Sequence, residues 1–204
     1  MLTYQWRTGV RMDFYPNTPT TIDELQKFLV LDGVPDMVTY KGSPVLAAAY
    51  AHWAHYDQKR KYGGRPYIDH PIRVAARAAM SGKVETLAGI SAAFLHDVLE
   101  DTPVMYAQLQ NEFGEDVAKL VSGLSNVKKT GVSRAEQKAL DRDRLAVASD
   151  MVKHIKWCDR LDNLWDLKEA PEDFRKLYLD ESRLLAATLG VPFQPLLEEP
   201  IGIS

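Results

Sequence analysis

A helical period of apolar residues runs through most of this chain and constrains its fold more than any other feature. From Pro44 onward, apolar residues recur about every 3.6 positions, which is typical of amphipathic helices around one core. After residue 44 the sequence has no alternating apolar–polar pattern long enough for a strand. It also has no internal repeat and no low-complexity tract. The sequence therefore predicts an all-α domain, built as a helical bundle.

Glycine, proline and polar segments separate the expected helices. Residues 84–99 are apolar on nearly every side, so this helix should be central and buried. Ser133 and Glu136 have the spacing of a capping box, which predicts a helix start at that point. The other expected helices are 45–59, 71–80, 105–113, 115–127, the continuation of the capped helix through 151–166, and 171–189.

The first forty residues differ from the rest. Pro16, Pro19 and Pro35 interrupt them, and only residues 22–31 have a helical period. We expect residues 1–40 to form an N-terminal extension of unknown role packed on the main domain, with a flexible tail as the alternative. Residues 41–204 are expected to form the main domain, since 204 residues suit one domain with a small appendage.

Charge and cysteine content narrow the setting in which the protein works. The net charge of −3 provides no general attraction to nucleic acid or to an anionic membrane. Cys158 is the single cysteine, which excludes an intrachain disulfide and fits a reducing compartment. No signal peptide is recognisable, and the longest apolar run, at 87–95, is too short to span a bilayer. We expect a cytoplasmic protein with no nucleic-acid or membrane partner.

His96 and Asp97 stand side by side inside the apolar segment, and Glu100 and Asp101 follow within one helical turn. An unpaired buried charge costs several kcal/mol or more, so a compensating group is needed. A bound divalent cation would compensate these groups, which makes the chain a candidate metallohydrolase. A hydrogen bond at a helix end is the alternative for an isolated His–Asp pair.

Two more residues qualify as ligands of the same ion. His70 lies at an expected helix start, and Asp159 lies in an otherwise core-like helix. Two imidazoles and two carboxylates suit Mn²⁺, Fe²⁺ or Zn²⁺, and the lack of thiolates argues against a structural zinc site. His52, His55, His154 and Cys158 are expected to be structural, and Trp53, Trp157 and Trp165 to belong to the core.

The acidic pair and two basic segments suit the chemistry of a phosphate ester. Asp101 is expected to orient a water molecule and Glu100 to assist proton transfer, with these roles open to exchange. The alternative is a solvated helix end, although acidic residues there oppose the helix dipole. Two basic segments, one around Gly63 and Gly64 and one near residue 130, could attract phosphates. The alternative is that both are solvated loops. Their basic residues are Lys59, Arg60, Lys61, Arg65, Lys128, Lys129 and Arg134.

Over roughly residues 45–190, these segments in this order resemble the HD-domain phosphohydrolases, and among them the hydrolase domain of RelA/SpoT homologues. The resemblance rests on residues 51–55 (AHWAH), 66–75 (PYIDHPIRVA), 94–102 (FLHDVLEDT), 113–117 (FGEDV) and 156–164 (KWCDRLDNL). It implies a stand-alone alarmone hydrolase with an HD-domain helical bundle. The implied reaction is Mn²⁺-dependent removal of the 3′-pyrophosphate of guanosine tetra- or pentaphosphate, with one ion per chain.

The resemblance also assigns roles by position. It implies the metal ligands His70, His96, Asp97 and Asp159, the catalytic pair Glu100 and Asp101, and the substrate contacts Arg60, Lys61 and Asn163. Weaker matches imply further substrate contacts by Lys128, Asp166, Arg175 and Tyr178. One departure is Asp162, which stands where histidine or tyrosine is common.

Several alternatives stay open from the sequence. One is another nucleotide phosphohydrolase, such as a phosphatase acting on the 2′-phosphate of NADPH. Another is a non-catalytic nucleotide-binding or antitoxin module. The sequence leaves open a homo-oligomer and a functional pairing with an alarmone synthetase. It leaves the native metal and the preferred nucleotide undetermined as well.

Overall fold

Helices make up the fold throughout the residues that the structure, a computed structural model, describes: 42–126 and 128–193. Within these residues the only extended pairing is an isolated bridge between Lys59 and Pro66. The all-α prediction is confirmed. The expected N-terminal extension, with its helix at 22–31, lies outside the described residues.

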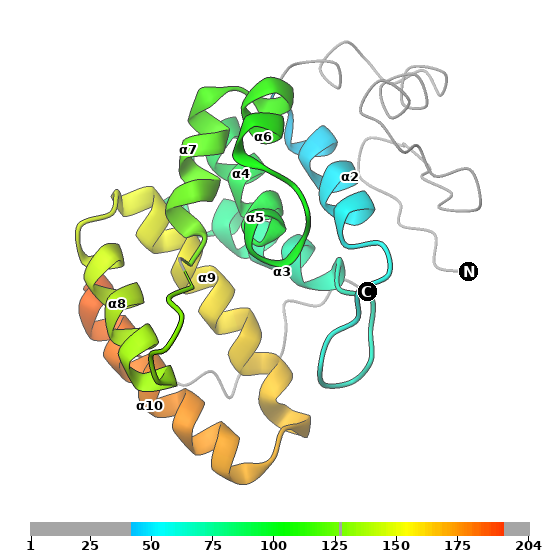
Figure 1. Ribbon diagram of the computed structural model, residues 1–204. Helices are drawn as coiled ribbons and strands as arrows, with labels where there is room; N and C mark the ends of the chain where they lie inside the picture. The colour runs from blue at the N-terminus through cyan, green and yellow to red at the C-terminus, as the bar shows by residue number, and fades with distance from the viewer. Residues whose placement is uncertain (1–41, 127, 194–204) are drawn as a thin grey trace.

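Helix α4 (Leu87–Leu95) forms the centre of the domain. It packs against α2 (Pro44–Ala54), α3 (Asp69–Met80) and α7 (Glu115–Leu124), as Figure 1 shows. Most of its residues are buried, and many are small, which lets neighbouring helices approach closely. The expectation of a central buried helix is confirmed for this part of the segment.

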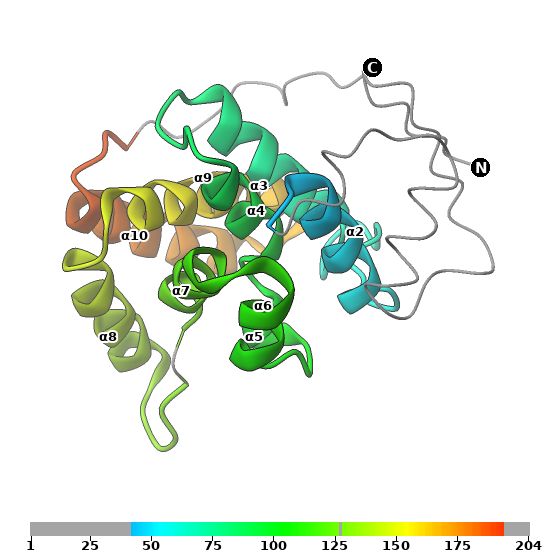
Figure 2. The same cartoon turned by 90° about the horizontal axis from the view of Figure 1, so that it is seen from above.

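Helix α9 (Asp150–Asp166) joins this central group to the other side of the domain. It packs on α3, and it also contacts α8 (Arg134–Ala146) and α10 (Glu172–Leu189). In both views α8 and α10 lie on the opposite side of the domain from α2 (Figures 1 and 2). The remaining elements are α5 (Val98–Asp101), α6 (Tyr106–Phe113) and the short 3₁₀ helix η2 (Leu167–Glu169).

The structure corrects the expected single helix at 84–99. Helix α4 begins only at Leu87 and ends at Leu95, and α5 is a separate turn after Asp97. His96 lies at the junction, where its Nδ1 is 2.9 Å from the carbonyl oxygen of Ala93 and satisfies a group at the end of α4. The apolar period continues across this junction and therefore gave no sign of the break.

The first expected helix, at 45–59, is also too long. It ends at Ala54, after which the chain folds back on itself through hydrogen bonds between Arg60 N and Arg65 O and between Tyr67 N and Gln58 O. Gly63 and Gly64 make this reversal with positive φ angles of 78° and 62°, a conformation that side chains disfavour. The reversal places Arg60 and Tyr67 next to the ends of α3 and α9.

Two helix boundaries farther along the chain also differ from those expected. The helix expected at 115–127 ends at Leu124, and the expected continuous segment through 166 divides into α8 and α9. The capping box is confirmed, because the Ser133 side chain accepts from Glu136 N and the Glu136 side chain accepts from Ser133 N. The capping box lies at the start of α8, and residues of α8 form one wall of a pocket.

Candidate metal centre and active site

The four predicted metal ligands converge from separate parts of the chain. His70 lies near the start of α3, His96 and Asp97 lie between α4 and α5, and Asp159 is on α9. One ligand atom from each of His70, His96 and Asp97 lies within 4.8 Å of the others, and all three residues are buried. Asp159 Oδ1 is 3.3 Å from His70 Nε2 and 3.8 Å from His96 Nε2.

The hydrogen bonds of the two imidazoles determine which of their nitrogens face this cluster. His96 Nδ1 faces the Ala93 carbonyl, and His70 Nδ1 is 2.7 Å from Asp162 Oδ2. Both partners are acceptors, so each Nδ1 carries a proton, and each Nε2 offers a lone pair once its ring is neutral. The two Nε2 atoms are only 3.1 Å apart, so two imidazole nitrogens and two carboxylates converge on one small space.

This arrangement fits one divalent cation. Two ligand atoms about 2.1 Å from one ion lie about 3.0–3.5 Å from each other. The Nε2–Nε2 distance is 3.1 Å, and Asp97 Oδ2 is 2.9 Å from His96 Nε2 and 3.5 Å from His70 Nε2. Nitrogen and carboxylate ligands without sulfur match the mixed-ligand class expected from the sequence.

The electrostatics of the cluster also call for positive charge. Burial alone would lower the pKa of His70, but the carboxylates of Asp159, Asp162 and Asp97 outweigh it and raise the pKa to about 10. For Asp159, burial opposes ionisation, yet the Lys156 ammonium and His70 hold its pKa well below the ordinary value. The carboxylates therefore stay ionised, and a proton or a metal ion must balance them.

Tyr67 holds one of the ligands in place. Its hydroxyl donates to Asp97 Oδ2 over 2.5 Å, and its ring stacks on His55 with centroids 4.5 Å apart. Burial, with the neighbouring Asp97 charge, raises the pKa of Tyr67, so the hydroxyl remains a donor. Tyr67 was not among the predicted site residues, although it lies three positions before His70 in the motif at 66–75.

The two members of the acidic pair have different surroundings. Glu100 accepts from the backbone N–H of Asn126 over 3.0 Å and lies 3.4 Å from its side-chain Nδ2, which fixes the carboxylate. Asp101 is exposed, and partial burial of its carboxyl together with the charges of Asp97 and Glu100 raises its pKa. Of the two, Asp101 is therefore better suited to carry a proton.

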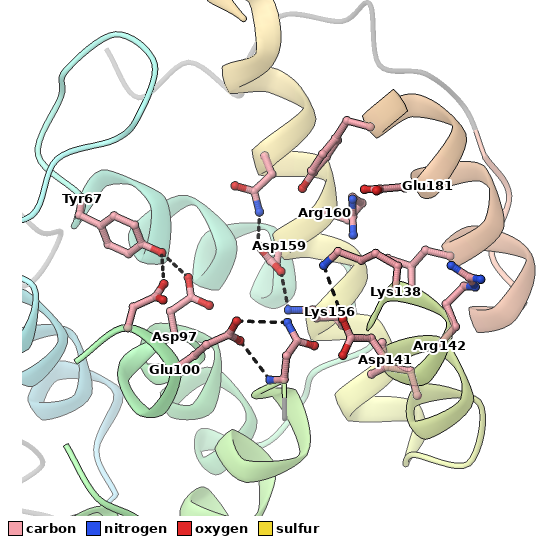
Figure 3. A pocket seen from close by; sticks show the side chains of 16 residues that line it. Tyr67, Asp97, Glu100, Lys138, Asp141, Arg142, Lys156, Asp159, Arg160 and Glu181 are labelled. Atoms are coloured by element: carbon pink, nitrogen blue, oxygen red, sulfur yellow. Dashed lines mark hydrogen bonds and ion pairs between the residues drawn. The ribbon is translucent and has the colours of Figure 1, made fainter. Parts of the chain in front are cut away.

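A pocket of about 190 Å³ extends from these residues toward α8 and α10. In Figure 3, Tyr67, Asp97 and Glu100 lie at one end, and Lys138, Arg142 and Arg160 lie at the other. Arg160 is buried against the Tyr178 ring, and its Nη1 has no hydrogen-bond partner among the described residues. A buried guanidinium with an unpaired N–H is well suited to an anion.

The residues predicted to contact substrate divide into two groups. Asn163 and Tyr178 line the pocket, and Asn163 Nδ2 donates to Asp159 Oδ1. Arg60 adjoins them, because its Nη2 donates to Asn163 Oδ1 over 2.6 Å. Asp166 contacts Arg60 Nε over 2.6 Å, and its carboxylate also accepts from Arg65 over 2.9 Å.

Like Arg60 and Asp166, the other three predicted contacts do not line the pocket. Lys61 is exposed, with its Nζ 5.4 Å from the ring centres of Tyr62 and Phe174. Lys128 is exposed as well, although its charge acts on Asp101. Arg175 lies half-buried on α10. The structure therefore brings together the predicted ligands, the acidic pair, Asn163 and Tyr178, and leaves these three outside.

Several residues that shape the site were missed at the sequence level. Lys156 is buried, and its ammonium lies 2.9 Å from Asp159 Oδ2. For Lys156, Arg160 and Asp162 a signal was present on α9, where polar side chains recur at helical spacing in a core-like helix. The missed residues are Tyr67, Asn126, Lys138, Arg142, Lys156, Arg160 and Asp162.

The residues expected to be structural behave largely as predicted. His55 is buried, and its Nδ1 lies 2.8 Å from Gln58 Oε1. Trp157 and Cys158 belong to the core cluster. Burial raises the pKa of Cys158 to about 12, which argues against a nucleophilic thiolate. Trp165 differs, because its ring contacts the guanidinium groups of Arg65 and Arg73 and is not part of the core cluster.

Similar sequences carry a related domain. A guanosine-3′,5′-bis(diphosphate) 3′-pyrophosphohydrolase of Aquifex aeolicus is 39% identical over 145 residues, which cover 71% of this chain and 20% of that protein. The MESH1 3′-pyrophosphohydrolase of Xenopus tropicalis is 34% identical over 137 residues, covering 66% of this chain and 75% of that protein. The chain thus spans about a fifth of the length of the first relative and three quarters of the second.

Solved structures share the fold. A metazoan orthologue of SpoT, described as hydrolysing ppGpp, matches with a TM-score of 0.66 and 30% identity over 72% of this chain and 84% of its own. A protein of Listeria monocytogenes EGD-e matches with a TM-score of 0.51 and 28% identity over 66% of this chain and 87% of its own. Among the described residues, no helix is long and apolar enough to cross a membrane. The family model described as "HD domain" matches residues 47–191, and the chain belongs to the HD-domain family.

Proposed function

We propose that this protein is a divalent-metal-dependent phosphohydrolase that removes the 3′-pyrophosphate of guanosine tetra- or pentaphosphate, releasing pyrophosphate and GDP or GTP. The observation that carries the proposal is the convergence of His70 Nε2, His96 Nε2 and two carboxylates beside an acidic pair. The relatives named as pyrophosphohydrolases, from Aquifex aeolicus and Xenopus tropicalis, support the choice of substrate.

The metal ligands would be His70, His96, Asp97 and Asp159, and Mn²⁺ is the ion we propose, one per chain. When bound, such an ion supplies Lewis-acid polarisation of water and phosphoryl oxygens at neutral pH. Lys156 stays protonated beside Asp159, because the nearby carboxylates raise its pKa against the effect of burial. Tyr67 and Lys156 thus hold the carboxylates of Asp97 and Asp159 in position.

The acidic pair would handle water and protons. Glu100, which accepts a hydrogen bond from Asn126, would orient a water molecule toward the phosphorus. Asp101, whose pKa is raised, would take up a proton from that water and return it to the leaving 3′ oxygen. These roles exchange those first expected from the sequence. Both carboxylates line the pocket, so a bound phosphoester would lie within their reach.

The arginines at the other end of the pocket suit the additional phosphate of a pyrophosphate group. Arg160 and Arg142 lie across the pocket from Glu100 in Figure 3. Their charges would neutralise the pyrophosphate and stabilise the added negative charge on its phosphoryl oxygens while the bond to the ribose 3′ oxygen breaks. Arg60, held by Asn163 and Asp166, presents a guanidinium whose face could stack on the purine base.

A nucleotide panel tests the proposal. The protein is incubated with Mn²⁺ and guanosine tetraphosphate, guanosine pentaphosphate or NADPH, with and without chelator, and the products are separated by chromatography. We expect pyrophosphate with GDP or GTP, and no turnover after chelation. Phosphate released from NADPH alone would instead identify a 2′-phosphatase. Nucleotide binding without metal-dependent turnover would identify a binding module.

A further inference from the structure

Asp162 is a buried charge that the proposed reaction leaves without a role. Its side chain is completely buried on α9, three residues after the ligand Asp159 and therefore on a neighbouring face of the helix. A buried carboxylate is costly unless charged donors surround it. The described partners of this carboxylate are His70 and two arginines of α3, Arg73 and Arg77.

The contacts of Asp162 are directed at one imidazole nitrogen. Oδ2 lies 2.7 Å from His70 Nδ1, and the same oxygen accepts from Arg73 Nη2 over 2.9 Å. Oδ1 accepts from Arg73 Nε over 2.6 Å, so the guanidinium binds the carboxylate through two nitrogens. This pairing prevents the carboxylate from rotating and keeps one oxygen aimed at His70.

Arg73 is itself held from its other side. Its guanidinium lies 4.7 Å from the centre of the Trp165 ring, and its Nη2 is 3.5 Å from Asp166 Oδ1. Asp166 in turn holds Arg60, whose Nη2 donates to Asn163, and Asn163 donates to the ligand Asp159. A continuous network of polar contacts therefore connects His70 to Asp159, so both of its ends lie in the proposed metal cluster.

We propose that Asp162 is a positioning residue that holds His70 in the Nδ1–H tautomer, so that Nε2 is available to a divalent cation. Only this tautomer can bind an ion through Nε2, because the other places a proton on the ligand atom. This inference rests on the metal site of the proposed function and gives a role to a buried carboxylate that the proposed reaction does not use.

Asp162→Asn is the sharpest variant. It keeps the side-chain shape, but the new amide can donate to His70 Nδ1 and so favour the wrong tautomer. We expect Mn²⁺ affinity, measured on the full chain by electron paramagnetic resonance of the free ion, to fall about 10- to 100-fold. The matched control is Asp116→Asn, which makes the same substitution at an exposed acid on α7 away from the pocket and should leave Mn²⁺ affinity unchanged.

A spectroscopic measurement reads the tautomer itself. In the wild-type protein loaded with Zn²⁺, ¹⁵N–¹H spectra should show a protected proton on His70 Nδ1 and a metal-bound Nε2. Asp162→Asn should remove this signature. The wild-type spectrum is informative even if the variant does not fold, because a proton on His70 Nε2 would overturn the proposal.

The outcomes separate this inference from the proposed function. A wild-type protein that binds neither Mn²⁺ nor Zn²⁺ would overturn the metal site and, with it, this role of Asp162. A wild-type protein that binds Mn²⁺, combined with a folded Asp162→Asn variant of equal affinity, would overturn only the positioning role.

Discussion

The acidic side chains of this site differ in the hydrogen bonds and ion pairs that restrain them, and the degree of restraint decides which chemical role each carboxylate suits. Asp97 is held by Tyr67, Glu100 by Asn126, and Asp159 by Lys156 and Asn163. Asp101 has the weakest restraint, a 3.4 Å contact with the Tyr67 hydroxyl. A fixed carboxylate suits metal or water binding, whereas a less restrained carboxyl with a raised pKa suits proton transfer.

The acidic pair can be tested apart from the metal ligands. Glu100→Gln and Asp101→Asn should each lower kcat by roughly 10²- to 10⁴-fold, the usual contribution of a general acid or base. Neither change should alter Mn²⁺ affinity much, because neither residue is a proposed ligand. Steady-state kinetics and Mn²⁺ binding measure the two effects. Asp116→Asn, an exposed acid on α7, is the control and should leave both unchanged.

The pH dependence of metal binding follows from His70. Its pKa is raised to about 10, so the metal-free protein holds a proton on this ring at neutral pH. Mn²⁺ must displace that proton, and its affinity should therefore rise about tenfold per pH unit up to the pKa. Asp97 and Asp159 do not add to this slope, because their lowered pKa values keep them ionised. Calorimetry between pH 6 and 8 tests this, and a constant affinity would contradict it.

Residue types and spacing selected the four side chains that the structure brings together, but not the residues that support them. His70, His96, Asp97 and Asp159 could be selected because buried polar groups stand out in apolar segments and because the motifs resemble a known family. Tyr67 and Asp162 could not be assigned a role, because each acts through a partner distant in sequence. Asp162, for example, contacts His70 across 92 positions.

Among the elements, α4, α9 and the turn before α3 determine the geometry of the centre. The sequence predicted most helices, since the 3.6-residue period reports which face is buried. It did not predict the break at His96 and Asp97, because that break depends on a side chain bonding the Ala93 carbonyl rather than on hydrophobicity. The misplaced end of the first helix has a similar cause: the reversal depends on pairing between Arg60 and Arg65.

Helix α8 offers a test of how an element supports the site. Ser133→Ala removes the side-chain acceptor of its capping box and should destabilise the protein by about 1 kcal/mol. That corresponds to a fall in Tm of about 2–4 °C for a domain of this size. Thermal unfolding followed by circular dichroism measures it. Ser122→Ala, at an exposed position inside α7, should cause no such fall, and equal Tm values for both variants would argue against the cap.

Across the whole molecule, the cation would join parts of the chain that are far apart in sequence. Its ligands come from α3, from the junction of α4 and α5, and from α9. Unfolding separates them, so binding should favour the folded state. At a free Mn²⁺ concentration 100 times the Kd, the added stability should be about 2.7 kcal/mol. Thermal unfolding with and without Mn²⁺ measures this gain, and an unchanged Tm under saturating ion would contradict it.

The central claim is that four side chains hold one catalytic ion, and an Mn²⁺ count on the purified protein tests it most directly. Electron paramagnetic resonance should find one tightly bound Mn²⁺ per wild-type chain. Asp97→Ala, which removes a ligand and the partner of Tyr67, should bind none at the same concentration and should lose turnover of guanosine tetraphosphate. A folded Asp97→Ala protein that retained stoichiometric Mn²⁺ and the wild-type rate would contradict the account.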